Sequence, residues 1–164
     1  IAKRTELAEG YVQHVMENGP TALMPITIGR TFYMGADPVM EQNNAIYREQ
    51  SLLVQELAEK SDCVIVGRSA DYILRDKKPL RLFIYADMES RMERCRKRAP
   101  EQEHFTDKEL RRHIQDVDKR RSKYYQFFTG QTWGEKLNYD LCINSGKLGF
   151  EKTVELIESY INIK

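Results

Sequence analysis

The segment that most constrains the fold is an apolar run that ends in Gly-Arg and leads directly into a helical pattern. Residues 62–74 read Asp-Cys-Val-Ile-Val-Gly-Arg-Ser-Ala-Asp-Tyr-Ile-Leu. The β-branched part of this run predicts a parallel strand that is buried on both faces. Arg68 would then stand at the carboxyl end of that strand, which is where open α/β sheets bind their ligands.

A second strand–helix unit follows directly. Residues 80–86 predict another strand, and residues 88–98 predict a helix dense in arginine. Arg94 and Arg98 are four residues apart, so they share one face of this helix. Like charges clustered in this way lower helix stability unless an anion or carboxylates balance them. Two strand ends followed by arginines indicate an anionic substrate, with phosphate as the first candidate.

These charged residues also have plainer interpretations. Gly67 suits a tight turn with Arg68 as a surface residue, and the arginines of 88–98 suit a solvated helix face. A nucleic-acid-binding patch is disfavoured, because aromatic residues are not interleaved with the arginines. Asp118, in the next basic helix, could hold an arginine, accept hydrogen bonds from a base, or simply pair with Arg121 on the surface.

The rest of the chain continues the alternation of helices and strands. Helices are predicted over residues 5–18 and 41–60, and a strand over 139–144. Thr106 and Glu109 form a capping box that opens a long helix ending before Gly130, and an amphipathic helix closes the chain. The predicted core positions of the helices are Leu7, Tyr11, Val15, Ile46, Leu53, Leu57, Leu110, Ile114, Val117, Phe150, Val154, Ile157 and Ile161.

Length and composition predict a single domain spanning residues 1–164, with 41% hydrophobic and 31% charged residues. No apolar run approaches membrane-spanning length, so we expect no membrane partner. Cys63, Cys95 and Cys142 are far apart, and two fall in predicted strands, which indicates reduced core thiols in a cytoplasmic protein. The opening residues resemble the end of a helix, so we expect the domain to be incomplete at its N-terminus.

The order of these pieces resembles the cytidylate kinase-like family of P-loop phosphotransferases. The resemblance covers about residues 44–161 and is most specific at 63–76, 118–133 and 138–149. It implies an α/β fold in which a P-loop NTPase-like parallel sheet is flanked by helices, as in nucleoside monophosphate kinases. It also implies a lid that includes residues 99–105. The implied activity is transfer of a phosphoryl group from ATP, with Mg²⁺, to a nucleoside monophosphate or a similar small acceptor.

The resemblance also implies roles for particular residues. The implied acceptor-binding residues are Arg48, Arg68, Asp118 and Arg121. The implied catalytic residues are Arg94 and Arg98, at the lid, and Arg120. The implied adenine-binding residues are Ser145, Gly146 and Lys147. No residue is implied as a direct metal ligand.

Two features depart from the family pattern. The sequence contains no Gly-x-x-x-x-Gly-Lys-Ser/Thr loop, the motif whose backbone amides cradle the phosphates of ATP. Family members also carry an acidic residue before Gly-Arg and an aspartate after it, where this chain has Val66 and Ser69. These substitutions favour an alternative, a non-catalytic nucleotide-binding or regulatory domain with the same fold. A nucleic-acid-binding protein is the third hypothesis, and its binding would weaken steeply with salt.

Overall fold

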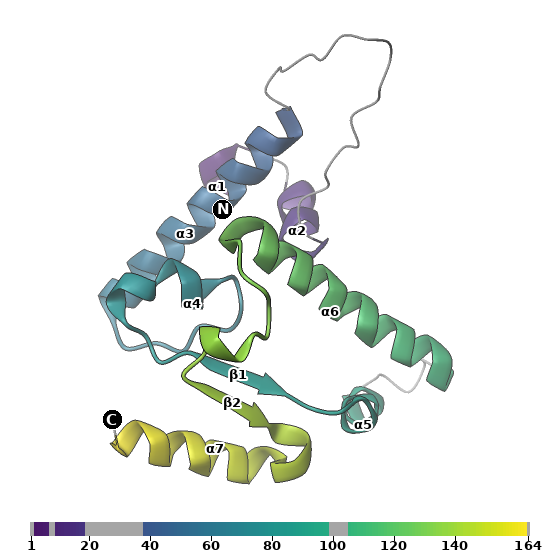
Figure 1. Cartoon of the computed structure of the whole chain (residues 1–164). Helices are drawn as coiled ribbons and strands as arrows, with labels where there is room; N and C mark the ends of the chain where they lie inside the picture. Colours follow the sequence, from purple (N-terminus) through teal and green to yellow (C-terminus); the bar gives the residue numbers. More distant parts are fainter. Residues whose placement is uncertain (1, 7–8, 19–37, 99–104, 164) are drawn as a thin grey trace. The chain divides into compact units, whose positions relative to one another are not determined.

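The computed structural model describes residues 2–6, 9–18, 38–98 and 105–163, and these form an α/β arrangement of helices with a small parallel sheet. From the composition of residues 21–38, which include Gly29, Gly35 and Pro38, we also expect a loop; this segment lies outside the described residues except for Pro38, which begins α3. The elements are α1 (Ala2–Thr5), α2 (Glu9–Asn18), α3 (Pro38–Lys60), α4 (Ala70–Ile73), η1 (Arg75–Lys77), β1 (Leu82–Tyr85), α5 (Met88–Arg98), α6 (Asp107–Thr129), η2 (Lys136–Asn138), β2 (Leu141–Asn144) and α7 (Ser145–Ile163) (Figure 1).

The chain divides into two compact units. The first unit comprises Ile1–Pro79 and Arg120–Trp133, and the second comprises Leu80–Lys119 and Gly134–Lys164. Helix α6 therefore contributes its first half to the second unit and its second half to the first unit. None of the helices in the described part of the chain is long and apolar enough to cross a membrane.

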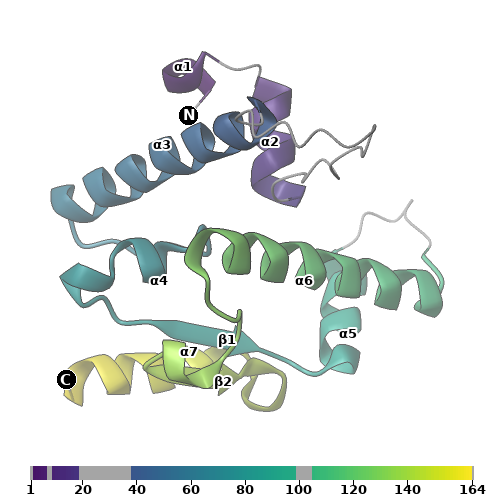
Figure 2. The ribbon, with the colours of Figure 1, turned by 45° about the horizontal axis from the view of Figure 1, so that its top comes forward.

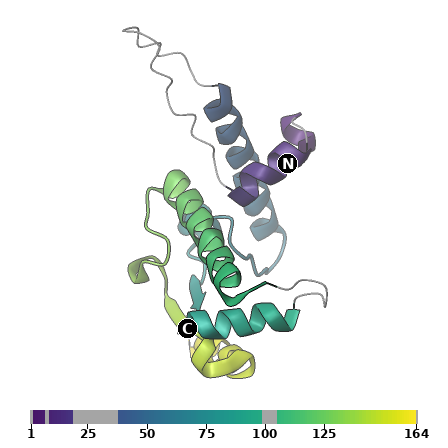
Figure 3. The ribbon, with the colours of Figure 1, turned by 90° about the vertical axis from the view of Figure 1, so that its right-hand side faces the viewer.

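Helix α3 carries the core of the first unit, with α1 and α2 beside it (Figures 1 and 3). Ile46, 1% exposed, packs against Val12 and Val15 of α2. About two turns further along the same face, Val54 packs against Ala70 and Ile73 of α4. The buried stripe of α3 differs from the predicted one, because Leu57 is 54% exposed. The stripe is instead formed by Asn43, Ile46, Gln50 and Val54, whose three- and four-residue spacings place them on one face.

The strand predicted at residues 63–66 does not form, and this prediction is wrong. The segment is irregular, and the side chains of Val64 and Val66 are 93% and 88% exposed. A strand requires a neighbour to satisfy its backbone hydrogen bonds, and no described residue pairs with this segment. The prediction of core thiols is also wrong, because Cys63, Cys95 and Cys142 are free but exposed.

The other two predicted strands form and pair in parallel, as expected. In the second unit, β1 lies beside β2 with Leu82 opposite Leu141 and Tyr85 opposite Asn144 (Figure 2). An ion pair between Arg81 and Asp140, with Nη2 and Oδ1 3.1 Å apart, joins the residues that precede the two strands. The sequence order β1–α5–α6–η2–β2 supplies the long crossover that a parallel pair needs.

Helix α7 contacts both strands but does not bury its apolar stripe against the described residues. Thr153 is buried, whereas Phe150, Val154 and Ile161 are 57%, 53% and 54% exposed. The sequence predicted the helix itself correctly, but predicted the wrong buried face. Gly149, at φ 78° and ψ 173°, kinks the helix near its start and so rotates the following turns relative to the first.

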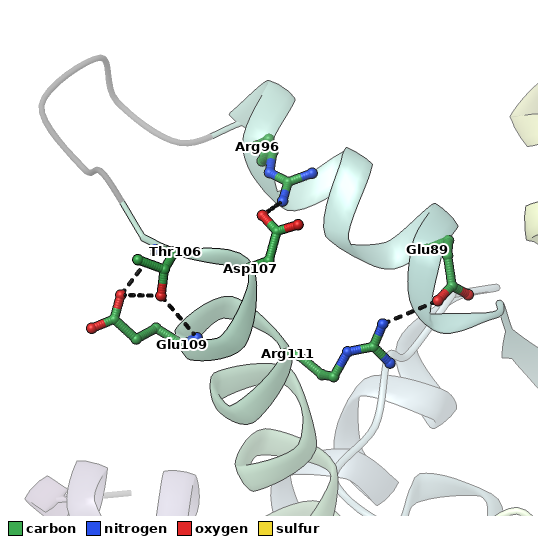
Figure 4. Close-up of polar contacts among 6 residues, drawn as sticks. All are labelled: Glu89, Arg96, Thr106, Asp107, Glu109 and Arg111. Atoms are coloured by element: carbon green, nitrogen blue, oxygen red, sulfur yellow. Dashed lines mark hydrogen bonds and ion pairs between the residues drawn. The ribbon is translucent and has the colours of Figure 1, made fainter.

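The capping box predicted at the start of α6 is present. The carboxylate of Glu109 accepts hydrogen bonds from the backbone N–H and the hydroxyl of Thr106, at 2.9 and 2.6 Å (Figure 4). Leu110 and Ile114 are buried, as predicted, and they pack with Met92 of α5. The predicted lid at 99–105 lies outside the described residues except for Phe105, which is exposed.

Candidate functional site

Arg68 lies in a left-handed turn between the irregular segment 62–66 and α4. The φ angles of Gly67, Arg68 and Ser69 are 72°, 59° and 52°. Glycine adopts this conformation freely, but residues with side chains do so at a cost of about 1–2 kcal/mol each. Such strain persists only where the surrounding structure enforces it, and it concentrates at functional sites. The Arg68 side chain is exposed, and its Nη1 donates a hydrogen bond to the backbone oxygen of Met16 at 3.0 Å.

A buried amide holds the backbone of this turn. Gln50, only 3% exposed, donates from Nε2 to the backbone oxygen of Arg68 at 3.1 Å. Its Oε1 accepts a hydrogen bond from the hydroxyl of Tyr124, also at 3.1 Å. Burial raises the pKa of Tyr124 to about 12, so the phenol stays protonated and remains a donor.

The remaining predicted site residues of the first unit lie on helices α3 and α6. Arg48 is exposed on α3, and Arg120 and Arg121 lie on successive positions of α6. Arg121 is exposed and Arg120 is partly buried. Ser69 is 4% exposed, and its hydroxyl has no hydrogen-bond partner in the described structure.

In the second unit, the structure brings Arg94 and Ser145 together. Arg94 donates from Nη1 to the hydroxyl of Ser145 at 3.0 Å and from Nη2 to its backbone oxygen at 2.6 Å. Its guanidinium also lies over the ring of Phe150, 4.4 Å from the centroid. Ser145, 2% exposed, donates in turn to the backbone oxygen of Tyr85 at the end of β1. Arg94 therefore fixes the junction between β2 and α7.

Gly146 and Lys147 form the first turn of α7, which Asn144 caps. The side-chain oxygen Oδ1 of Asn144 accepts from the backbone N–H of Gly146 at 3.0 Å and of Lys147 at 3.4 Å. A Cβ atom on Gly146 would stand 2.8 Å from Oδ2 of Asp87 and 2.9 Å from the hydroxyl of Ser90. Glycine is therefore required here for close packing, while Lys147 is exposed.

Asp87 performs a similar capping role for α5. Its Oδ1 accepts a hydrogen bond from the backbone N–H of Ser90 at 2.9 Å, and its Oδ2 accepts from the Ser90 hydroxyl at 3.0 Å. These two hydrogen bonds lower the pKa of the Asp87 carboxyl below its usual range, and the bond from the backbone N–H of Ser90 has the larger effect. This carboxylate thus remains charged at neutral pH beside the first turn of α7.

Asp118 forms a bidentate pair with Arg91. The two hydrogen bonds, from Nη1 to Oδ2 and from Nη2 to Oδ1, are 2.7 and 2.8 Å long. Both side chains are less than one third exposed, so this pair joins α5 to α6 more firmly than a surface pair would. Of the alternatives that the sequence left open for Asp118, the structure shows the one in which it holds an arginine. Arg98, at the end of α5, is exposed.

Sequence reasoning missed Gln50 as a supporting residue for Arg68. A signal was available, because Gln50 lies four residues after Ile46 and four before Val54. A glutamine on an otherwise apolar helix stripe needs hydrogen-bond partners when it is buried. Identifying those partners as Arg68 and Tyr124 required the tertiary structure, since they lie 18 and 74 residues away.

Comparisons with known proteins agree with this architecture. The model of the "Cytidylate kinase-like family" matches residues 1–147. A cytidylate kinase from Archaeoglobus fulgidus is 32% identical over 125 residues, which cover 76% of this chain and 67% of the relative. A solved structure of an uncharacterized protein from Eubacterium ventriosum matches 99% of this chain and 88% of its own, with 23% identity and a TM-score of 0.63, and so shows the fold alone. Because the family model spans most of the sequence and the curated relative supports it, this chain belongs to the cytidylate kinase-like family.

Proposed function

We propose that this protein is a nucleotide kinase that transfers a phosphoryl group from ATP to a nucleoside monophosphate or a similar small phosphate acceptor. The family membership supports the class of reaction, and the observation that carries the proposal within the molecule is Arg68. Its guanidinium is exposed while its backbone is held in a strained turn by a buried amide. A planar donor fork of this kind suits the bidentate recognition of a phosphate.

Family membership implies the use of ATP and Mg²⁺. The described residues are compatible with an Mg²⁺ ion that is held mainly by the phosphates of the bound nucleotide. No three His, Cys, Asp or Glu residues in the described ranges gather as a metal site would require. Mg²⁺ is commonly held through one or two carboxylates together with substrate phosphates, so this observation is compatible with its use. When bound, ATP with Mg²⁺ supplies the phosphoryl group and neutralises part of its charge.

The chain's own residues would then act by binding and orientation. We assign Arg48 and Arg68 to the acceptor phosphate, with Asp118 and Arg121 as further acceptor-binding candidates. Arg94, Arg98 and Arg120 are the candidates that stabilise the transferring group, and Ser145, Gly146 and Lys147 are the candidates for the adenine side. In this scheme residues 1–164 belong to one kinase-like domain with a P-loop NTPase-like fold, and 99–105 are part of its lid.

A non-catalytic nucleotide-binding domain is the second candidate function. It is favoured by Ser69, whose buried hydroxyl replaces the aspartate of the family pattern and has no partner in the described part of the chain. A neutral hydroxyl cannot carry the negative charge that a carboxylate would bring to the Gly-Arg turn. In this alternative, the protein would bind a nucleotide without transferring phosphate.

The deciding experiment measures phosphoryl transfer to a panel of nucleoside monophosphates with ATP and Mg²⁺. It uses the full-length protein. Residues 1–164 contain no Gly-x-x-x-x-Gly-Lys-Ser/Thr loop, and we expect these residues by themselves to transfer no phosphate. Transfer to at least one acceptor supports the kinase. Nucleotide binding by calorimetry without any transfer would refute it and favour the non-catalytic domain.

The same assay tests Arg68. We expect Arg68→Lys to lower kcat/KM by roughly ten- to a thousandfold, because lysine keeps the charge but loses the bidentate fork. Arg96→Lys is the matched control, since Arg96 is exposed and pairs with Asp107 on the surface of α6 (Figure 4). Full activity of Arg68→Lys would show that Gly67-Arg68 is only a turn.

A further inference from the structure

The carbonyl oxygen of Arg68 accepts its hydrogen bond from another helix, whereas the carbonyl oxygens of Gly67 and Ser69 accept theirs from amides nearby in the chain. The backbone oxygen of Gly67 accepts from the N–H of Ala70 at 3.1 Å, and that of Ser69 accepts from the N–H groups of Tyr72 and Ile73. These bonds are local and would form in an isolated turn. The oxygen of Arg68 instead accepts from Gln50 on α3. Gln50 thus joins the middle residue of the turn to the core of the first unit.

Glutamine is well suited to this position. Its amide carries a donor and an acceptor at the end of one side chain, and here the donor meets Arg68 and the acceptor meets Tyr124. Glutamate would supply no donor for the Arg68 oxygen, and an apolar residue would satisfy neither partner. Because Tyr124 is buried and occupies Oε1, the amide plane of Gln50 cannot rotate freely. Its Nε2 is therefore aimed at the turn.

We propose that Gln50 is a positioning residue for the acceptor site. By fixing the backbone of Arg68 in its left-handed conformation, Gln50 holds the guanidinium where it can meet the acceptor phosphate. This inference rests on the proposed function for its consequence in catalysis, but the mechanical tie between α3 and the turn can be tested without any nucleotide. A substitution at Gln50 acts through Arg68 and touches no substrate.

The first test is hydrogen exchange of the 164-residue chain without nucleotide. We expect Gln50→Met, which keeps the length of the side chain but removes both hydrogen bonds, to speed exchange at the amides of Ala70, Tyr72 and Ile73 about tenfold. The matched control is Gln13→Met, because the Gln13 amide is exposed and donates a hydrogen bond to Glu17 on its own helix. Unchanged exchange at these amides in Gln50→Met would overturn the inference.

A second variant keeps the test decisive if Gln50→Met does not fold. Tyr124→Phe retains the ring and removes only the hydroxyl, so it frees Oε1 of Gln50 while leaving the bond to Arg68 possible. We expect a smaller increase in exchange at the same three amides, about two- to fourfold. If the turn in Tyr124→Phe exchanges at the wild-type rate and Gln50→Met is unfolded, the proposed role of the amide in holding the turn is wrong.

The second test is kinetic and separates positioning from general structure. In the natural protein, we expect Gln50→Met to raise the KM for the acceptor about tenfold while the KM for ATP changes less than about twofold. In an Arg68→Lys background, the same substitution should change the acceptor KM less than about twofold, because its effect passes through Arg68. Equal effects in both backgrounds, or equal effects on both substrates, would overturn the positioning role.

The two tests also distinguish the failure of this inference from the failure of the proposed function. If the natural protein transfers phosphate but Gln50→Met changes neither exchange nor the acceptor KM, only the inference is wrong. If exchange responds as expected while no acceptor is phosphorylated, Gln50 holds the turn but the kinase proposal is wrong. In that case the positioning role in catalysis is refuted together with the kinase.

Discussion

Arg94 offers the sharpest test of the described geometry, because the family resemblance implies a catalytic role for it, whereas the structure shows it in contact with Ser145 and Phe150. Its guanidinium makes two hydrogen bonds to Ser145 and lies over Phe150. We expect Arg94→Lys to lower the free energy of unfolding. Lysine retains the charge and one hydrogen bond, but it cannot reach both oxygens of Ser145 while it covers the aromatic ring.

The magnitude follows from what is lost. A hydrogen bond from a charged donor contributes about 1.5–3 kcal/mol, and a cation over an aromatic ring about 0.5–1 kcal/mol at a partly exposed site. Arg94 is half-buried, and lysine recovers part of the first contribution, so we expect a loss of about 2 kcal/mol. For a chain of this size, that corresponds to a decrease of roughly 4–8 °C in Tm.

The assay is thermal unfolding followed by far-ultraviolet circular dichroism, with Arg98→Lys as the matched control. Arg98 lies one turn later on α5 and is exposed, so its replacement should change stability by less than about 0.5 kcal/mol. Phe150→Leu adds a double-mutant cycle, in which non-additivity with Arg94→Lys confirms the stacking contact. If Arg94→Lys and the wild type had the same Tm, the two hydrogen bonds from Arg94 to Ser145 would not stabilise the fold, and the reasoning would be refuted.

Two further predictions concern stability alone. The pKa of Glu109 lies below its ordinary value of 4.5, chiefly because the hydroxyl of Thr106 donates to the carboxylate. The stability that the charged Glu109 carboxylate gives to the folded state is present above its unfolded pKa and is lost as pH falls through its folded pKa. The Tm difference between the wild type and Glu109→Gln should therefore shrink from about pH 6 to about pH 3. A constant difference would contradict the cap. Lys78 has a φ of 50° at the end of η1, so Lys78→Gly should raise Tm by about 2–4 °C, whereas Lys77→Gly, inside the helical turn, should lower it. Lower Tm in Lys78→Gly would show that the left-handed backbone is not strained.

The features that the sequence predicted correctly are those that depend on neighbouring residues. The capping box at Thr106 and Glu109 formed as predicted, because both partners lie within one helical turn. The strands around Phe83 and Ile143 were also found, since their short apolar runs are bounded by polar residues. The family was identified in the same way, from the order of these local patterns along the chain.

The features that only the tertiary structure decided depend on contacts between distant segments. An apolar run such as 63–66 has the composition of a strand, but it becomes one only where a neighbouring backbone supplies hydrogen bonds. The periodicity of α3 allowed more than one buried face, and packing against α2 and α4 selected the face of Ile46 and Gln50.

The hydrogen-bond partners of charged and polar side chains also could not be predicted from the sequence. An arginine on a helix face can meet solvent, a ligand or a protein oxygen, and nothing in its local pattern distinguishes these environments. Ser145 is 51 residues from Arg94, and Asp118 is 27 residues from Arg91. The sequence determined which residues could bind an anion and on which elements they lie. Which of them are already engaged by the protein was decided by the fold, because a hydrogen bond between distant residues exists only after packing has brought the two groups together.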